Sequence, residues 1–348
     1  MGDALIKSGK RDLFWDIIKG IAILLVLLGH SIQCSCSFGA ESCYDNPLYR
    51  LIYSFHMPLF MIICGYFFYG TMRHYNARQI IQKKVSSLGV PIVVFGLISF
   101  PIYFSGPVSI NNVVHHLLTS MTLLWFLCQI ILCSVTVLLI NRLIGDRYIV
   151  YCLLCAFSML VPNVAGMERY SFMLPMFVLG YYLNKTGLME LILGPRKVTI
   201  CIIGGFVFIA LLHFYGRESF IYTSKTYLWG GENPPLKQLG INIYRVLIGI
   251  VGSVFVMTLV RVVLDKLHFD ENKSFLAFCG RLSLGIYCFQ SFFWHFYPLM
   301  PGVDSMVAKC FPFSVVLGFV VSLLLCVCLS WSSSKNKYTS LLFLGSRR

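Results

Sequence analysis

The chain has 348 residues, of which 57% are apolar and 12% are charged, and its mean hydropathy is +0.77. Soluble domains carry about 25% charged residues. This composition therefore excludes a string of soluble domains and predicts an all-α integral membrane protein. The net charge of +14 would suit a nucleic-acid-binding protein. The distribution of the basic residues along the chain distinguishes this interpretation from one based on membrane topology.

About ten apolar segments of helical length follow one another and are expected to cross the membrane: 17–34, 48–70, 86–105, 122–140, 148–163, 170–184, 198–215, 240–264, 282–300 and 311–331. If the N-terminus is inside, 21 of the 28 Lys and Arg residues fall on that side. This is the positive-inside bias of membrane proteins. The bias and the even number of segments both predict cytoplasmic termini. Topology then explains most of the charge, and we expect no nucleic-acid partner.

The first segment carries ionisable groups inside an apolar run. Asp16, Lys19 and His30 interrupt it, and such groups are costly in hydrocarbon, which makes them a functional hypothesis. Eleven residues at about 100° each make about three turns plus 20°, so Lys19 and His30 share a helix face about 16 Å apart. Asp16 lies one turn before Lys19 on the same stripe. The pattern is typical of one wall of a buried polar channel, and it favours a retained helix over a cleaved signal peptide.

The second segment repeats this feature, because His56 is followed closely by Pro58. A proline frees a backbone carbonyl, which is tolerated in a span where a neighbour or a cavity satisfies it. Short connections make antiparallel neighbours, so His30 and His56 could face one cavity. The alternative for His56 is a histidine that hydrogen-bonds across a helix pair and serves packing alone.

The connections and the cysteines give weaker signals. Two long outer loops are expected at 106–121 and 216–239, and a mobile tail is expected after residue 331. The second loop is rich in Gly and Pro and is a substrate lid or, as we favour, a solvated connector. Most of the 14 cysteines lie inside apolar segments as small hydrophobes, and no paired CxxC pattern predicts zinc. A disulfide in an oxidising compartment remains open among Cys34, Cys36 and Cys43.

Five short motifs, taken together, resemble those of the bacterial integral-membrane acyltransferase-3 family, of the O-antigen and polysaccharide O-acetylase type. The first is a basic residue and a histidine separated by ten residues, which Lys19 and His30 match. The others lie at 55–66, 124–127, 174–181 and 280–287. In this order they span nearly the whole chain, and they are specific for the superfamily but not for a substrate.

Two departures from the family pattern concern its later motifs. Gln290 stands where relatives often have a histidine shortly after Tyr287, and His295 comes further on. Ser87 stands where a second basic residue often follows the Lys83–Lys84 pair. We expect no extracytoplasmic hydrolase-like domain of the kind that some relatives carry. We therefore expect a membrane-embedded acyltransferase domain over 1–331 and a short cytoplasmic tail over 332–348, acting alone or with a separate partner.

The resemblance implies an O-acyltransferase of the bacterial inner membrane that moves an acyl group, such as acetyl from acetyl-CoA, to a glycan or lipid-linked saccharide hydroxyl. Acyl transfer needs a base for the hydroxyl proton and a group that stabilises the oxyanion. His30 is the natural base, because a buried imidazole is neutral and its unperturbed pKa lies near the operating pH. Lys19 is too distant to touch His30, so we expect it to pair with Asp16 or to meet the anionic donor.

The remaining candidates follow from position and residue type. Basic residues at the inner face would suit the donor phosphates, although topology alone explains such a cluster: Arg73, Arg78, Lys83 and Lys84. Acceptor binding is assigned to polar and aromatic groups within the segments: His56, Trp125, Gln129, Tyr287 and Gln290. For Trp125 and Tyr287, interfacial or core packing is the stronger explanation. No metal is expected, and homo-oligomerisation stays open.

Two other function classes fit part of the pattern. A secondary transporter also has about ten spans with intramembrane Asp, Lys and His. Inverted repeats would then place interrupted helices in both halves, yet nothing after residue 180 matches the polar stripe of the first segment. A passive scaffold leaves the buried charges unexplained. The acceptor, the acyl group and the side of the membrane where transfer occurs are not fixed by the sequence.

Overall fold

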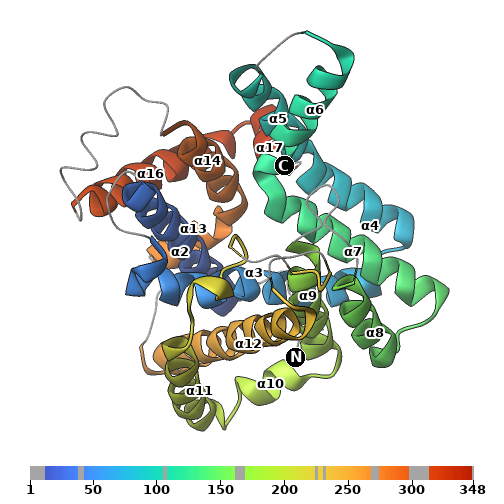
Figure 1. The fold of residues 1–348 in the computed structure, drawn as a ribbon, viewed down its shortest axis with the longest axis vertical. Helices are drawn as coiled ribbons and strands as arrows, with labels where there is room; N and C mark the ends of the chain where they lie inside the picture. The colour runs from blue at the N-terminus through green and yellow to red at the C-terminus, as the bar shows by residue number, and fades with distance from the viewer. Residues whose placement is uncertain are drawn as a thin grey trace. The chain divides into compact units, whose positions relative to one another are not determined.

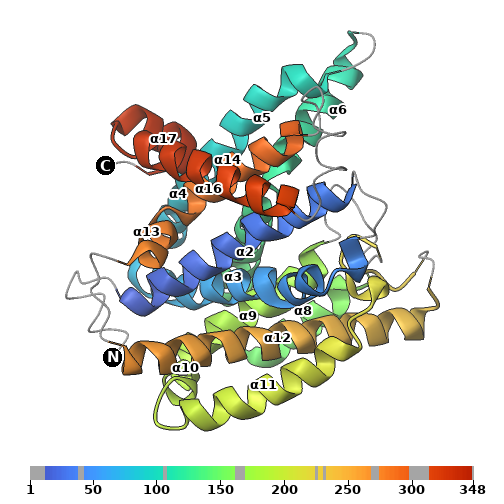
Figure 2. The same cartoon turned by 90° about the vertical axis from the view of Figure 1, so that its left-hand side faces the viewer.

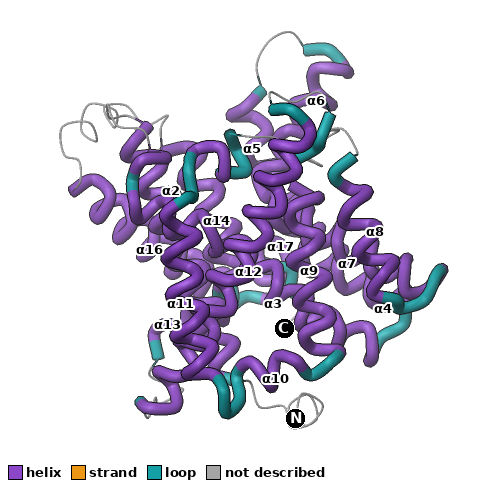
Figure 3. Tube along the Cα trace, turned by 60° about the horizontal axis from the view of Figure 1, so that its bottom comes forward, coloured by secondary structure: helices purple, strands orange, loops and turns teal. Residues whose placement is uncertain are grey.

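The computed structural model describes residues 12–37, 43–104, 108–160, 169–223, 226–229, 233–267, 274–297 and 313–346. These residues form helices joined by turns and loops and contain no strand (Figure 3). The all-α prediction is therefore confirmed for the part of the chain that is described. The order of the helices can be followed in Figure 1 from α2 in blue to α17 in red.

Each of the ten predicted segments contains a helix, and the bounds of these helices are α2 (Leu13–Ser37), α3 (Pro47–His74), α5 (Val90–Tyr103), α7 (Trp125–Leu143), α8 (Tyr148–Ser158), α9 (Tyr170–Lys185), α11 (Lys197–His213), α12 (Pro235–Lys266), α14 (Ser283–Phe296) and α16 (Phe313–Ser333). Shorter helices lie between them: α4 (Ala77–Lys84), α6 (Ile110–Met121), α10 (Leu188–Ile192), α13 (Phe275–Arg281) and α17 (Lys337–Leu344). Single turns complete the order: η1 (Cys43–Asp45), η2 (Val85–Gly89), η3 (Thr122–Leu124) and η5 (Arg217–Ser219).

Six helical stretches among the described residues are long and apolar enough to cross a membrane: 13–36, 47–74, 77–102, 110–143, 235–266 and 313–333. The bent pair of α13 and α14 makes a seventh if it is one span, whereas α8 and α11 are apolar but shorter. Because a bilayer needs about 20 apolar residues per helix, these stretches indicate a multi-pass membrane protein. Ten spans and cytoplasmic termini stay predictions.

Two segments expected to be connections or tails contain helices. The predicted loop at 106–121 contains α6, which begins where the Ser109 hydroxyl accepts the Asn112 N–H at 3.2 Å. The predicted mobile tail contains α17, capped where the Asn336 side chain accepts the Tyr338 N–H at 2.8 Å. Both helices are rich in polar residues, so a search for apolar runs passes over them. Their N-cap residues satisfy the backbone donors that each first turn leaves open.

The described residues fall into two compact units that alternate along the chain. Unit 1 comprises Met1–Leu25, Tyr44–Tyr75 and Cys133–Arg281, and unit 2 comprises Val26–Cys43, Asn76–Leu132 and Leu282–Arg348. Helix α2 therefore supplies its first half to unit 1 and its second half to unit 2. Asp16, Lys19 and His56 belong to unit 1, whereas His30 belongs to unit 2.

Unit 1 is built on α3, which packs against α9 and α12, and α11 runs beside α12 (Figure 2). At the α3–α9 crossing, Gly65 and Gly180 each lie directly against the other helix. A Cβ atom at Gly65 would overlap the carbonyl of Phe177, and one at Gly180 would overlap the carbonyl of Ile62. Small residues let membrane helices approach this closely, so both glycines are required by packing.

A second glycine pair joins α2 to α13 within the same unit. A Cβ atom at Gly20 would overlap the carbonyl of Leu276, and one at Gly280 would overlap the carbonyl of Asp16. The contact is therefore reciprocal, as at the α3–α9 crossing. It places the turn of α2 that carries Asp16 and Lys19 directly against α13.

The connection before α12 is anchored to that helix. The guanidinium of Arg245, which is 2% exposed, donates from Nε to the Ser219 carbonyl at 2.9 Å. Its Nη2 donates to the carbonyls of Glu218 and Phe220, each at 2.8 Å. A buried cation satisfied by three backbone carbonyls fixes the path of the chain. This arrangement supports the connector interpretation of the described part of 216–239 over the lid interpretation.

Unit 2 gathers the second half of α2 with α14, α16, α17 and the helices from α4 to the start of α7. Helix α14 packs against α16, and the Ser31 hydroxyl of α2 donates to the Val315 carbonyl of α16 at 2.6 Å. Gly318 lies at this junction, where an added Cβ atom would come 2.9 Å from Ser31 Oγ and 3.2 Å from the Trp294 ring. Helices α2, α14 and α16 therefore meet at Gly318.

Candidate functional site

The predicted pairing of Lys19 with Asp16 is present in unit 1. The two residues lie one turn apart on α2, and Lys19 Nζ is 3.1 Å from Asp16 Oδ1. The Asp16 side chain is 9% exposed and the Lys19 side chain 28% exposed. Lys19 Nζ also lies 5.4 Å from the centre of the Phe67 ring on α3. The carboxylate therefore neutralises a lysine that an apolar helix would otherwise tolerate poorly.

His30 lies in unit 2 on the second half of α2. The side chain of Gln33, one turn further along, hydrogen-bonds to the His30 ring. His295 of α14 lies close enough for its charge to act on His30. Two histidines from helices that are distant in the sequence thus interact electrostatically. His295 is a residue that the sequence reasoning did not select.

The ring of His295 is held by its own helix. Its Nδ1 lies 3.0 Å from the Ser291 carbonyl, four residues earlier. Because a carbonyl only accepts hydrogen bonds, this contact places the ring proton on Nδ1, and the lone pair of a neutral ring is then on Nε2. The sequence signal for His295 was an imidazole within the apolar segment 282–300, the same signal that selected His30.

Two side chains on α14 bury polar atoms for which the described residues provide no hydrogen-bond partner. Gln290 is fully buried, and its Nε2 donates to Ser291 Oγ at 2.9 Å while Oε1 is unsatisfied. Trp294 is 6% exposed, and its indole Nε1 is also unsatisfied. Buried polar groups are normally hydrogen-bonded, so each such group calls for an explanation. Gln290 therefore lies in the interior of unit 2, and its assignment to acceptor binding stays a prediction.

The other acceptor candidates of unit 2 lie where α14 meets the start of α7. The Tyr287 hydroxyl accepts the Phe126 N–H at 3.2 Å. This amide belongs to the first turn of α7, whose donors have no partner within the helix. Tyr287 thus caps α7, in agreement with a packing role. Trp125 is half-buried at the first position of α7, and Gln129 is buried one turn later.

His56 is buried in α3 within unit 1. Its Nδ1 lies 2.7 Å from the Ile52 carbonyl of its own helix, which places the ring proton on that nitrogen. The ring stands edge-on to Tyr53, with 4.9 Å between the ring centres. This hydrogen bond runs within the helix. Because His30 belongs to the other unit, a cavity shared by the two histidines stays a prediction.

The four basic donor candidates flank the connection from α3 to α4. Arg73 lies in the last turn of α3, Arg78 in the first turn of α4, and Lys83 and Lys84 in its last turn. All except the half-buried Lys84 are exposed. The lysine pair is followed at once by the π-helical turn η2. Such turns are rare and are often found at functional sites.

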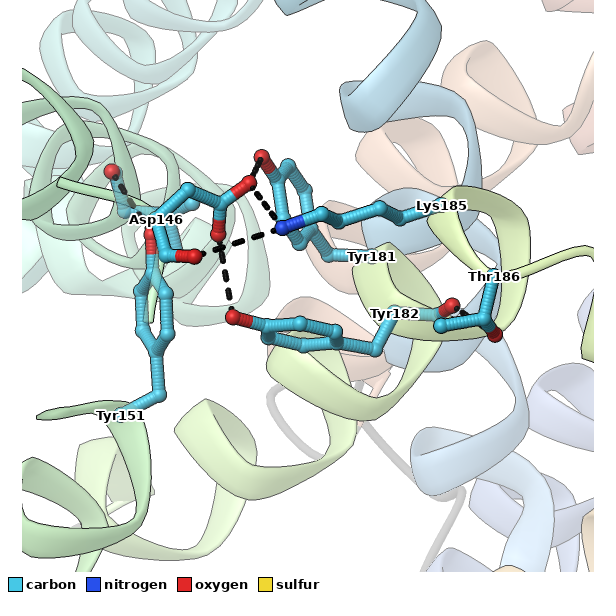
Figure 4. A network of polar contacts seen from close by, with 7 residues as sticks. Asp146, Tyr151, Tyr181, Tyr182, Lys185 and Thr186 are labelled. Carbon is cyan, nitrogen blue, oxygen red and sulfur yellow. Dashed lines mark hydrogen bonds and ion pairs between the residues drawn. The ribbon is translucent and has the colours of Figure 1, made fainter. Parts of the chain in front are cut away.

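A polar network absent from the sequence predictions surrounds Asp146, between α7 and α8. Figure 4 shows Tyr181, Tyr182 and Lys185 of α9 pointing toward its carboxylate. The Tyr181 hydroxyl donates to Oδ2 at 2.8 Å, and the Tyr182 hydroxyl donates to Oδ1 at 3.0 Å. Lys185 Nζ lies 2.7 Å from Oδ2. Both carboxylate oxygens are satisfied, so the network fastens the α7–α8 connection to α9.

Comparison with known families gives one match that covers most of the chain. The family model described as "Acyltransferase domain", acyltransferase-3, matches residues 12–331. The matched region begins just before α2 and ends near the C-terminus of α16. It includes every predicted site residue of both units.

Two curated relatives match a shorter part of the chain. The nodulation protein NolL of Sinorhizobium fredii is 35% identical over 86 residues, which are 25% of this chain and 24% of that protein. The nodulation protein NolL of Mesorhizobium japonicum is 36% identical over 86 residues, 25% of this chain and 23% of that protein. The chain thus matches about a quarter of the length of each relative.

Proposed function

We propose that this chain, which belongs to the acyltransferase-3 family, transfers an acyl group from acyl-CoA to a hydroxyl of a cell-surface glycan or its lipid-linked precursor. The family and the apolar helices make it a multi-pass membrane acyltransferase. The observation that carries the finer proposal is His30, an imidazole inside the apolar helix α2 that is hydrogen-bonded by Gln33 and lies within range of the charge of His295. Acetyl from acetyl-CoA is the proposed group, and the bacterial inner membrane the proposed location.

In the proposed reaction His30 acts as general base. It takes the proton of the acceptor hydroxyl, and the oxygen attacks the thioester carbonyl to give a tetrahedral oxyanion. This attack forms the C–O bond of the ester, and collapse of the intermediate restores the carbonyl and breaks the C–S bond. The thiolate that leaves receives the proton from His30. Gln33 supports this role because a hydrogen bond to the ring restricts its orientation.

The donor is proposed to bind on the side that carries the basic residues. Its phosphates would meet Lys83 and Lys84, with Arg73 and Arg78 nearby in the sequence. Lys19 is a further contact for an anionic donor, because its side chain is 28% exposed while that of its partner Asp16 is more deeply buried. Acceptor binding is proposed for His56, Trp125, Gln129, Tyr287 and Gln290.

The proposal is tested by acyl transfer with purified wild-type protein. In lipid nanodiscs with radiolabelled acetyl-CoA and a panel of glycosides, we expect label on a glycoside hydroxyl and an equal amount of free CoA thiol. The measurement is thin-layer separation of the labelled product together with a thiol assay. A transporter would move a substrate across sealed vesicles without releasing thiol, and that outcome would contradict an acyltransferase reaction.

The donor site is tested by removing the basic pair. Acetyl-CoA is expected to raise the melting temperature of the wild-type protein, because a ligand that binds the folded state stabilises it. Lys83→Gln with Lys84→Gln should weaken binding about tenfold, which costs about 1.4 kcal/mol of that stabilisation. The matched control, Arg142→Gln with Arg147→Gln, removes the same charge from two exposed residues. Equal stabilisation of both double variants would remove Lys83 and Lys84 from the donor site.

A further inference from the structure

The unsatisfied atoms of Gln290 and Trp294 lie on one face of α14. The two residues are four positions apart, so their side chains are neighbours, with about 5–6 Å between Cβ atoms. One atom is an amide oxygen that requires a donor, and the other is an indole N–H that requires an acceptor. Leaving a buried polar atom unpaired costs about 1–3 kcal/mol, so two such atoms on one helix face indicate a missing partner.

The surroundings of the pair are those of the candidate catalytic histidines. His295 directly follows Trp294 in the chain, and its charge acts on His30. The Trp294 ring and Ser31, the residue after His30, approach Gly318 of α16 from two different helices. All of these residues belong to unit 2. A group bound at Gln290 and Trp294 would therefore lie in the same helix junction as the proposed base.

We propose that Gln290 and Trp294 form the subsite for the hydroxyl-bearing end of the acyl acceptor, an inference that rests on the proposed function. A hydroxyl both donates and accepts, so one hydroxyl or two neighbouring sugar hydroxyls satisfy both protein atoms. A thioester carbonyl only accepts and would leave Gln290 Oε1 unpaired. The pair therefore matches the chemistry of the acceptor better than that of the reacting end of the donor.

The subsite predicts an unusual combination of effects on binding and stability. Gln290→Met removes the unsatisfied Oε1 together with one hydrogen bond, from Nε2 to Ser291 Oγ. Trp294→Phe removes the unsatisfied N–H together with part of a buried ring. Because the unsatisfied atom is lost in each case, each variant should lower the melting temperature of the ligand-free protein only slightly. Each should weaken binding of methyl α-D-gluco-, manno- or galactopyranoside about tenfold, the equivalent of one lost hydrogen bond. Binding is measured by thermal shift in nanodiscs without any donor. Trp331→Phe, on the exposed face of α16, is the matched control.

Gln238→Met provides the opposite case for stability. Gln238 is also buried, but both ends of its amide are paired: Nε2 donates to Asn242 Oδ1 at 3.0 Å, and Oε1 accepts from Asn233 Nδ2 at 3.1 Å. This substitution should therefore lower the melting temperature more than Gln290→Met does. If Gln290→Met and Trp294→Phe lower it equally, the two residues are structural and the proposal is overturned. It is also overturned if no glycoside stabilises the wild type, or if the variants bind glycosides as well as it does.

A kinetic measurement separates this inference from the proposed function. Where the wild type transfers acetyl to a glycoside, both variants should raise the KM for the glycoside about tenfold and leave the KM for acetyl-CoA unchanged. A fall in kcat at constant glycoside KM would instead assign the pair to the oxyanion and contradict an acceptor subsite. Glycoside binding without any transfer would contradict the proposed function alone.

Discussion

Replacing His30 with alanine is expected to abolish acyl transfer while the protein still inserts and folds. The substitution removes the proposed base, and loss of a general base typically costs about 10²–10⁴-fold in rate. His30 is only partly buried on α2, so the cavity left behind is small. The measurement is the initial rate of acetyl transfer to a glycan acceptor by membranes that contain equal amounts of each variant.

His115→Ala is the matched control for this substitution. His115 is an exposed histidine of α6 in the same unit, so its removal should leave the rate unchanged. His30→Gln keeps a polar side chain beside Gln33 and should be as inactive as His30→Ala, because an amide cannot serve as base. A His30→Ala variant with wild-type activity would rule out the proposed base without affecting the family assignment.

The largest effect on stability is expected at the crossing of α3 and α9. Gly180→Ala would place a methyl group onto the Ile62 carbonyl, so the two helices must move apart. Overpacking typically costs about 1–3 kcal/mol, and overlap with backbone belongs at the upper end because no side chain can rotate away. We expect the free energy of unfolding, measured by denaturant in detergent, to fall by about 3 kcal/mol. A variant that fails to accumulate in membranes would show the same destabilisation.

Gly240→Ala is the control for Gly180→Ala. Gly240 lies in α12 with open space where its Cβ atom would be. Alanine there should leave the free energy of unfolding unchanged or raise it by about 0.5–1 kcal/mol, because alanine has the higher helix propensity. The Gly65→Ala, Gly180→Ala double variant should lose less than the sum of the single losses, because the first methyl group already separates the helices. Wild-type stability of Gly180→Ala would contradict the close crossing.

Hydropathy was sufficient to predict the main helices but not the polar ones. All ten predicted segments contain a helix, because apolar runs of this length have few alternatives in a membrane. Helix α4 was missed because its residues are polar. Its start was nevertheless visible in the sequence, since Asn76 and Gln79 form a capping box with bonds of 3.0 and 3.1 Å. A search for N-cap patterns would thus have found α4, which hydropathy alone did not predict.

In the candidate site, contacts between residues close in the sequence were predictable, whereas contacts between distant helices were not. The Asp16–Lys19 ion pair was predictable because three residues of helix fix the separation of the two side chains. The approach of His295 to His30 was not, because it depends on how α14 packs against the second half of α2. The unsatisfied atoms of Gln290 and Trp294 were also invisible, since a sequence does not show which partners a buried group lacks.

The π-helical turn η2 changes how this chain must be compared with its relatives. A turn that holds one additional residue rotates every following side chain by about 100°, as a one-residue insertion in an α-helix does. Ser87, which stands where a second basic residue was expected, lies within this turn, and Ser86 Oγ donates to the Lys83 carbonyl at 3.1 Å. Where a relative lacks this turn, counting residues from Lys83 across η2 pairs positions whose side chains point in different directions. Alignments of this region should therefore be anchored separately on α4 and on α5. When a basic residue seems to be missing here, a shift of register should be examined before the difference is taken as a loss of function.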